Sequence, residues 1–210
     1  MTVTASATGT PVRNYAPIHL ALFAAITLFC LAPAGHAQEI SVQLDPAQSK
    51  IEFTLGSTLH TVEGVFKLKS GSIRYDPSSG KMSGSIIVDA TSGESGNEGR
   101  DHKMHREILE SGKYPEFVFA PNRGDGAFNP KGPSKLDVLG KFNIHGQDHE
   151  MTIPIEIQPS GRQLSVAAHI TIPYIKWGLK NPSTFILRAS DKVEIEIHAV
   201  GHLVGEEAAR

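Results

Sequence analysis

The stretch 138–157 reads VLGKFNIHGQDHEMTIPIEI, and its pattern decides the fold. Every second residue from Val138 to Ile144 is apolar or glycine. The turn-forming sequence HGQD follows at 145–148, and the alternation returns from Ile153 to Ile157. A period of two is typical of strands with one dry face and one solvated face, and glycine-containing turns join such strands. The stretch therefore predicts two antiparallel strands of a β-sheet.

The same pattern recurs over most of the chain. Turn sequences such as DPSSG at 76–80 and PSG at 159–161 separate the alternating runs. Many short strands at close spacing predict a sandwich or a barrel, and a strand as long as 162–173 favours a barrel because closure removes exposed edges. We therefore expect an all-β fold, an antiparallel β-barrel, with strands at 40–45, 50–56, 62–69, 71–76, 81–90, 115–121, 135–145, 149–158, 162–173 and 192–203.

One stretch departs from the alternation. Between 97 and 111, Met104 and Ile108 lie four residues apart with Leu109 beside them, and Gly112 follows. This spacing predicts one short amphipathic helix that ends at a glycine. Because the helix lies between two blocks of strands, we expect it near an open end of the barrel.

The N-terminal segment has the pattern of an export signal. The run LALFAAITLFCL at 20–31 is uncharged, and Gly35 and Ala37 supply the small side chains that a signal peptidase accepts. We expect cleavage between Ala37 and Gln38, which divides the chain into a signal peptide, 1–37, and one domain, 38–210, in the periplasm or otherwise secreted. The alternative is an uncleaved membrane anchor, but the apolar run of 15 residues is shorter than the roughly 20 that a span needs.

Composition excludes several classes of function. The chain of 210 residues has 20 basic and 22 acidic side chains, so it lacks the basic excess of a nucleic-acid binder. Its single cysteine, Cys30, lies in the signal segment, which leaves the expected domain without thiols or disulfides. No nucleophile elbow, phosphate-binding loop or dinucleotide fingerprint occurs. We therefore expect no catalytic residue, no metal and no cofactor.

Histidines carry the alternative interpretation. His102 and His105 lie three apart in the predicted helix, and His145 and His149 flank a predicted turn. Imidazole nitrogens are good zinc ligands, so convergence of these four would favour a metal-dependent or enzymatic protein. Their spacing matches no known metal signature, and we favour the interpretation that they are surface and turn histidines.

Beside His102, Arg100 and Asp101 begin the predicted helix. Asp101 is expected to cap the helix, because a carboxylate accepts hydrogen bonds from first-turn N–H groups. Arg100 is expected to pair with Asp101 or with the head group of a ligand.

The residues expected inside the barrel share the inward parity of their strands. They are Phe53, Leu55, Phe66, Leu68, Ile86, Val88, Phe117, Phe119, Phe142, Ile144, Ile170 and Ile172. Such a set fills a packed core or lines a hollow one, and the alternation does not choose between the two.

Six short pieces resemble, in order, the YceI-like family of lipocalin-shaped polyisoprenoid-binding proteins. They are LDPAQSKIEF at 44–53, VEGVF at 62–66, GNEGRDHKM at 96–104, YPEFVF at 114–119, GKFNIHG at 140–146 and KWGL at 176–179. The chain departs from the family's usual pattern along the helix, at Met104 and at Ile108 with Leu109, and before the late glycine turn, at Lys176 with Trp177.

The resemblance implies a lipocalin-like calyx, open at one end, that binds an isoprenoid, a quinone-like molecule or a fatty amide, as an exported carrier or scavenger without enzymatic activity. The twelve inward residues would contact the apolar chain. The residues expected at the pocket mouth are Arg100, Asp101, Met104, Ile108 and Trp177. A ligand-free stress-response module is a further alternative. A homodimer is left open, and no stable membrane span is expected.

Overall fold

The computed structural model describes residues 1, 2, 4, 9, 39–184 and 188–205. The chain divides into two units, Met1–His36 and Ala37–Arg210, and the fold described here belongs to the second. The expected signal segment lies outside the described residues except for positions 1, 2, 4 and 9. No helix within the described part of the chain combines the length and the apolar character that a membrane crossing requires.

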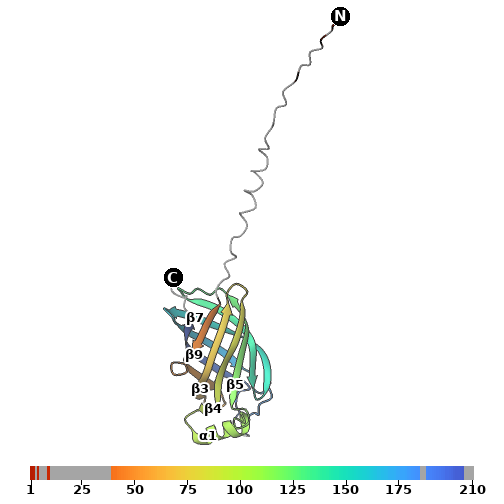
Figure 1. The fold of residues 1–210 in the computed structure, drawn as a ribbon. Coiled ribbons are helices and arrows are strands. Elements are labelled where there is room, and N and C mark those ends of the chain that lie inside the picture. Colours follow the sequence, from red (N-terminus) through yellow and green to blue (C-terminus); the bar gives the residue numbers. More distant parts are fainter. Residues whose placement is uncertain (3, 5–8, 10–38, 185–187, 206–210) are drawn as a thin grey trace. The chain divides into compact units, whose positions relative to one another are not determined.

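Nine strands and one short helical segment make up the described part of the second unit (Figure 1). The strands are β1 (Ile40–Leu44), β2 (Lys50–Leu55), β3 (Val62–Asp76), β4 (Lys81–Glu94), β5 (Glu116–Gly126), β6 (Ser134–Ile144), β7 (Gln147–Ser160), β8 (Gln163–Ile172) and β9 (Val193–Val204). The helix α1 (Glu98–Lys103) continues into a π-helical turn, η2 (Met104–Ile108).

The strands form a closed antiparallel barrel with eight positions. Consecutive strands from β3 to β9 pair with each other, and β2 completes the ring between β9 and β3. The strand β1 lies in the same position as β2, between the same two neighbours but farther along them: it pairs with 72–75 of β3 and 201–204 of β9. The all-β barrel predicted from the alternation is confirmed.

The junction between β1 and β2 is sealed by side-chain and backbone hydrogen bonds. The Asp45 backbone N–H donates to the Val200 carbonyl at 2.7 Å, and the Val200 N–H donates to Ser49 Oγ at 3.1 Å. The Ser49 hydroxyl in turn donates to the Asp45 carbonyl at 2.7 Å. These bonds replace the ladder where neither strand reaches β9, so the wall stays closed across the turn.

The predictions for four strands are corrected. The separate strands expected at 62–69 and 71–76 form the single strand β3, which shifts register twice against β4, between Val65 and Lys67 and between Leu68 and Ser70. Such bulges interrupt the alternation without ending the ladder, which is why the sequence suggested a break. The strands expected at 81–90 and 115–121 also run on, to Glu94 and Gly126.

The helix differs from its prediction at both ends. Its N-cap is Asn97, whose side chain accepts from the Arg100 N–H at 3.0 Å, so the prediction that Asp101 caps it is wrong. Asp101 already lies in the first turn, where its carboxylate accepts from the Ser95 N–H instead, at 3.0 Å. The helical segment ends at Ile108 rather than at Gly112, and the chain turns at Glu110, which has a φ of 46°.

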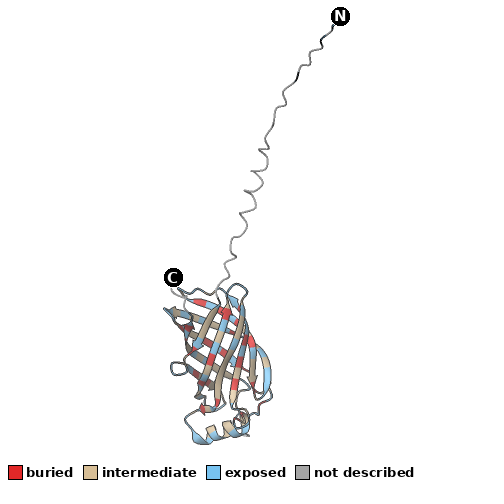
Figure 2. Ribbon diagram, viewed as in Figure 1, coloured by how far each residue is buried: buried red, intermediate tan, exposed pale blue. Residues whose placement is uncertain are grey.

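Burial follows the pleat of the strands. Figure 2 shows buried and exposed positions alternating along them. Most inward residues belong to one large apolar cluster, which Met104, Ile108 and the following Leu109 join, and Leu44, Ile51 and Leu68 form a smaller second cluster. The helix therefore packs its apolar face across one end of the barrel (Figure 1).

Candidate functional site

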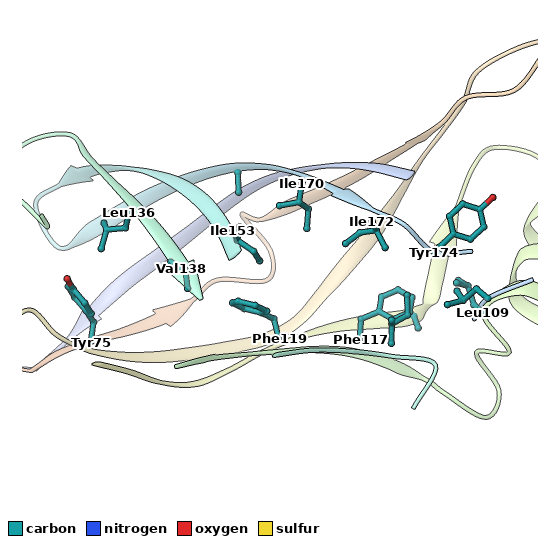
Figure 3. Packing of buried hydrophobic residues seen from close by; sticks show 14 residues of the cluster. Tyr75, Leu109, Phe117, Phe119, Leu136, Val138, Ile153, Ile170, Ile172 and Tyr174 are labelled. Carbon is teal, nitrogen blue, oxygen red and sulfur yellow. The ribbon is translucent and has the colours of Figure 1, made fainter. Parts of the chain in front are cut away.

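The barrel interior is hollow. It contains a cavity of about 510 Å³ whose wall takes residues from all nine strands and is almost entirely apolar. Figure 3 shows Phe117 and Phe119 on one side of this interior and Ile170 and Ile172 on the opposite side. The structure places all twelve residues of the expected inward set in the cavity wall.

Aromatic rings gather in the half of the cavity near α1. Phe53 and Phe66 lie 5.3 Å apart between ring centroids, Phe66 and Phe117 lie 5.4 Å apart, and Phe117 and Phe142 lie 6.3 Å apart. We call these four residues the aromatic belt. They belong to four strands, β2, β3, β5 and β6, which all begin or end on the side of the barrel where α1 lies. The belt presents flat apolar faces to whatever enters the cavity from that side.

The glycines of the wall provide room for the rings. A Cβ atom at Gly140 would lie 2.6 Å from the Phe119 ring, and one at Gly64 would lie 2.4 Å from the Phe53 ring. These glycines share the inward parity of their strands, so each lets an aromatic side chain lie flat against backbone. A larger residue at either position would displace the ring.

Among the described residues that line the cavity, the fully charged side chains all come from α1. Arg100, Lys103, Met104 and Ile108 of the helical segment line the cavity there, together with His60 of the β2–β3 loop. The Arg100 side chain is held by Ser95: its Nε donates to Ser95 Oγ at 2.7 Å, and its Nη2 donates to the Ser95 carbonyl at 2.7 Å. Three of the expected mouth residues, Arg100, Met104 and Ile108, thus line the cavity at the end of the barrel where α1 lies.

Asp101 and Trp177, also expected at the mouth, are not part of the cavity wall. The Asp101 carboxylate accepts from both the N–H and the hydroxyl of Ser95, so Arg100 and Asp101 meet through this serine. The Trp177 ring stacks on His149, which lies opposite Phe142 on β7, with a centroid distance of 4.2 Å and an interplanar angle of 8°. It also approaches Phe142, at 6.0 Å, and so packs against the apolar cluster without lining the cavity.

The four histidines of the alternative interpretation do not come together. His105 spans Gly93 O, at 2.9 Å, and Ser111 Oγ, at 3.0 Å, whereas His102 is exposed beside Arg106. The remaining pair, at 145 and 149, packs on Tyr114 and Trp177, respectively. Among the described residues, which include all four, no three His, Cys, Asp or Glu side chains are placed to hold a metal ion.

Sequence reasoning missed Lys103 and Tyr174. Lys103 follows Arg100 by three residues, and this spacing puts both side chains on one face of a helix, a signal that could have found it. Tyr174 had no such signal. It lines the cavity from the segment after β8 and donates from its hydroxyl to the Ser190 carbonyl at 2.6 Å. Burial of the phenol, reinforced by the negative charge of Asp191, raises the pKa of Tyr174 to about 12.

Comparison with known proteins identifies the family. A model described as the YceI-like domain matches residues 42–201 of the chain. This chain belongs to the YceI-like family. The match spans the barrel from β1 to β9, so the resemblance noted in the sequence is confirmed. Two similar proteins are UPF0312 proteins of Vibrio vulnificus, from strains YJ016 and CMCP6. Each is 27% identical to this chain over 132 residues, which are 61% of this chain and 68% of the relative.

Solved structures share the YceI-like barrel. BcnA of Burkholderia cenocepacia aligns with a TM-score of 0.64 and 21% identity, over 75% of this chain and 98% of BcnA. A polyisoprenoid-binding domain of Saccharophagus degradans aligns with a TM-score of 0.58 and 14% identity, over 79% and 99%. The YceI protein of Campylobacter jejuni aligns with a TM-score of 0.57 and 19% identity, over 71% of this chain and 88% of that protein. At these identities the likeness establishes a common fold.

Proposed function

We propose that this protein is an exported binding protein that holds an apolar chain inside its barrel and performs no chemistry of its own. The observation that carries the proposal is the apolar cavity of about 510 Å³. Ligand pockets in proteins typically measure about 300–1,000 Å³, so a ligand-sized space fits here. The polyisoprenoid-binding domain from Saccharophagus degradans, which shares the fold, supports an isoprenoid as one ligand class.

The energetics of an apolar cavity suit reversible capture. Burying about 400 Å² of apolar chain contributes on the order of 10 kcal/mol before costs. Association and ordering of the chain take back several kcal/mol. The remainder, about 5–8 kcal/mol, corresponds to dissociation constants from roughly 200 micromolar down to about 1 micromolar. Affinities in this range favour a carrier or scavenger that takes up and releases its ligand.

Export is the second part of the proposal, and it rests on the signal pattern of residues 1–37. We expect the mature protein to begin at Gln38 in the periplasm, or outside the cell, because Gly35 and Ala37 fit the peptidase. Intact mass of the protein from a periplasmic extract tests this expectation. A mass that includes residues 1–37 would contradict cleavage.

Ligand binding is tested by mass spectrometry of the protein purified from its natural host without detergent. We expect native spectra with an added mass that organic extraction identifies as a long-chain lipid. The proposal would be refuted if the protein purified without a ligand and also failed to bind any apolar chain added afterwards. Metal content is measured on the same untagged sample, and stoichiometric zinc would favour the metal-dependent alternative instead.

A further inference from the structure

The charges of the cavity wall are one-sided. Among the described residues that line the cavity, Arg100 and Lys103 carry the only full charges, and no Asp or Glu belongs to the wall. Both cations come from α1 and lie three residues apart, so they project from the same face of the helix. They therefore form a pair of positive charges at the α1 end of an otherwise largely apolar cavity.

Both side chains keep donors for a further partner. The two hydrogen bonds from Arg100 to Ser95 use two of the five N–H donors of a guanidinium and fix its orientation. Lys103 Nζ makes one long contact, 3.4 Å to the Pro182 carbonyl, out of the three donors of an ammonium. The nearest carboxylate along the helix, Asp101, is bound to Ser95 and stays outside the wall. No acidic side chain of the wall competes for these cations.

We propose that Arg100 and Lys103 bind the head group of the ligand, and that this head group is an anion. The inference rests on the proposed function and narrows its ligand class to amphiphiles that carry a carboxylate or a phosphate on one end of a long apolar chain. The apolar chain then passes the aromatic belt into the barrel while the oxyanion stays at α1.

The physical reason is the cost of leaving two cations without an anion. A neutral alcohol, amide or quinone that covers Arg100 and Lys103 displaces their water and accepts hydrogen bonds, but it brings no opposite charge. A carboxylate or phosphate accepts the same hydrogen bonds with both partners ionised, and the guanidinium fork matches two oxygens of either group. The same two residues thus attract anionic amphiphiles and disfavour neutral ones of equal length.

Three probes with one chain length separate the head group from the chain: hexadecanoate, hexadecyl phosphate and hexadecan-1-ol. Each is titrated against the full-length mature protein loaded with an uncharged fluorescent dye, and displacement gives the dissociation constant. We expect at least one of the two anions to bind about tenfold or more tightly than the alcohol, because hydrogen bonds to charged groups exceed neutral ones. Whichever anion binds more tightly identifies the source of the head group.

Variants assign the preference to the two cations. Lys103→Gln should remove most of the preference for the anion, measured as the ratio of the dissociation constants of hexadecan-1-ol and the anion. The double variant Arg100→Gln/Lys103→Gln should abolish the preference. The matched control is Arg106→Gln, which removes one positive charge from the same helical segment at an exposed position outside the wall. It should change neither affinity.

Each outcome supports or overturns a specific part of the proposal. Equal binding of all three probes overturns the inference and leaves the proposed function standing, since the chain would still be captured. A preference that survives in the double variant, or that Arg106→Gln removes equally, also overturns it, because general attraction would then explain the effect. Failure of every probe to displace the dye refutes the proposed function itself, and the inference falls with it.

Discussion

A single charge placed inside the barrel distinguishes a hollow interior from a filled one. Phe142 lies on β6 with its side chain in the cavity wall, and it is only partly buried. Its ring lies 6.3 Å from Phe117 and 6.0 Å from Trp177, so it belongs to the belt but borders open space. In Phe142→Lys the ammonium can reach that space, whereas in a close-packed core it would find neither water nor a partner.

The expected cost to the fold is small. Removing a fully buried phenylalanine costs about 3–5 kcal/mol, and partial burial together with the packing of the four-carbon lysine stem reduces this to about 1–2 kcal/mol. For a domain of this size, that loss lowers the melting temperature by about 2–8 °C. The expected cost to binding is larger. An unpaired ammonium against an apolar chain loses several kcal/mol, which weakens capture of an uncharged ligand by about a hundredfold or more.

Circular dichroism melts and displacement of an uncharged dye measure the two effects on the same sample. Lys141→Gln is the control for the opposite face, because Lys141 is exposed and points away from the cavity. Ala90→Lys is the control for a charge without room: Ala90 is 0% exposed and lies outside the cavity wall, so this variant should not fold. The reasoning is refuted if Phe142→Lys unfolds as Ala90→Lys does, or if it binds the dye as tightly as the unaltered protein.

Three further predictions concern stability. Hydroxyl groups of the β3–β4 turn donate to Asp76 and lower its pKa to about 2, so its contribution to stability is present above the ordinary carboxyl pKa of 3.8 and is lost as the pH falls towards 2. Denaturant unfolding between pH 5 and 2 should therefore show a smaller acid loss in Asp76→Asn, and an identical loss would count against this assignment. The pKa of Tyr174 is raised to about 12, so its contribution to stability is present below pH 10 and declines as the pH rises through 12. A titration followed by absorbance at 295 nm should show one tyrosine that ionises near pH 12, and Tyr174→Phe should remove that transition. Gly84 has a φ of 118°, and a Cβ there would lie 2.0 Å from the Ser72 carbonyl oxygen. Gly84→Ala should therefore lower the free energy of unfolding by about 2 kcal/mol or more and the melting temperature by roughly 4 °C or more. An unchanged melting temperature in calorimetry would disprove the backbone argument.

The inward set could be predicted from the sequence because the pleat is a local property. Phe117 and Phe119 share a face whatever the rest of the chain does, and the alternation of β5, β6 and β8 carried through to the cavity wall. Ser70 and Gly71 misled the prediction for β3, because a bulge breaks the period while the hydrogen-bonded ladder continues. Hollowness could not be predicted, since it depends on the sum of side-chain volumes around the ring.

At the α1 end of the cavity, lining residues were predictable only where one helix sets the geometry. Arg100, Met104 and Ile108 follow helical spacing, and they line the cavity as that spacing suggests. Trp177 comes from the segment between β8 and β9, whose path depends on what it packs against, and it stacks on His149 without lining the cavity. Asp101 was misplaced because a carboxylate near a helix start serves equally as a cap or as an acceptor for a preceding loop.

The shared barrel position of β1 and β2 has a consequence for how the polypeptide becomes folded. Both strands need β9 as a neighbour, with Ser41 opposite Val204 and Phe53 opposite Ile195, so contacts between the first and last strands close the ring. A chain that emerges from its N-terminus keeps these two strands unpaired on one side until nearly all of the sequence has been made. High contact order of this kind slows folding and leaves apolar edges open to other chains. The ring therefore closes, and these edges become covered, only when β9 is available to pair with β1 and β2.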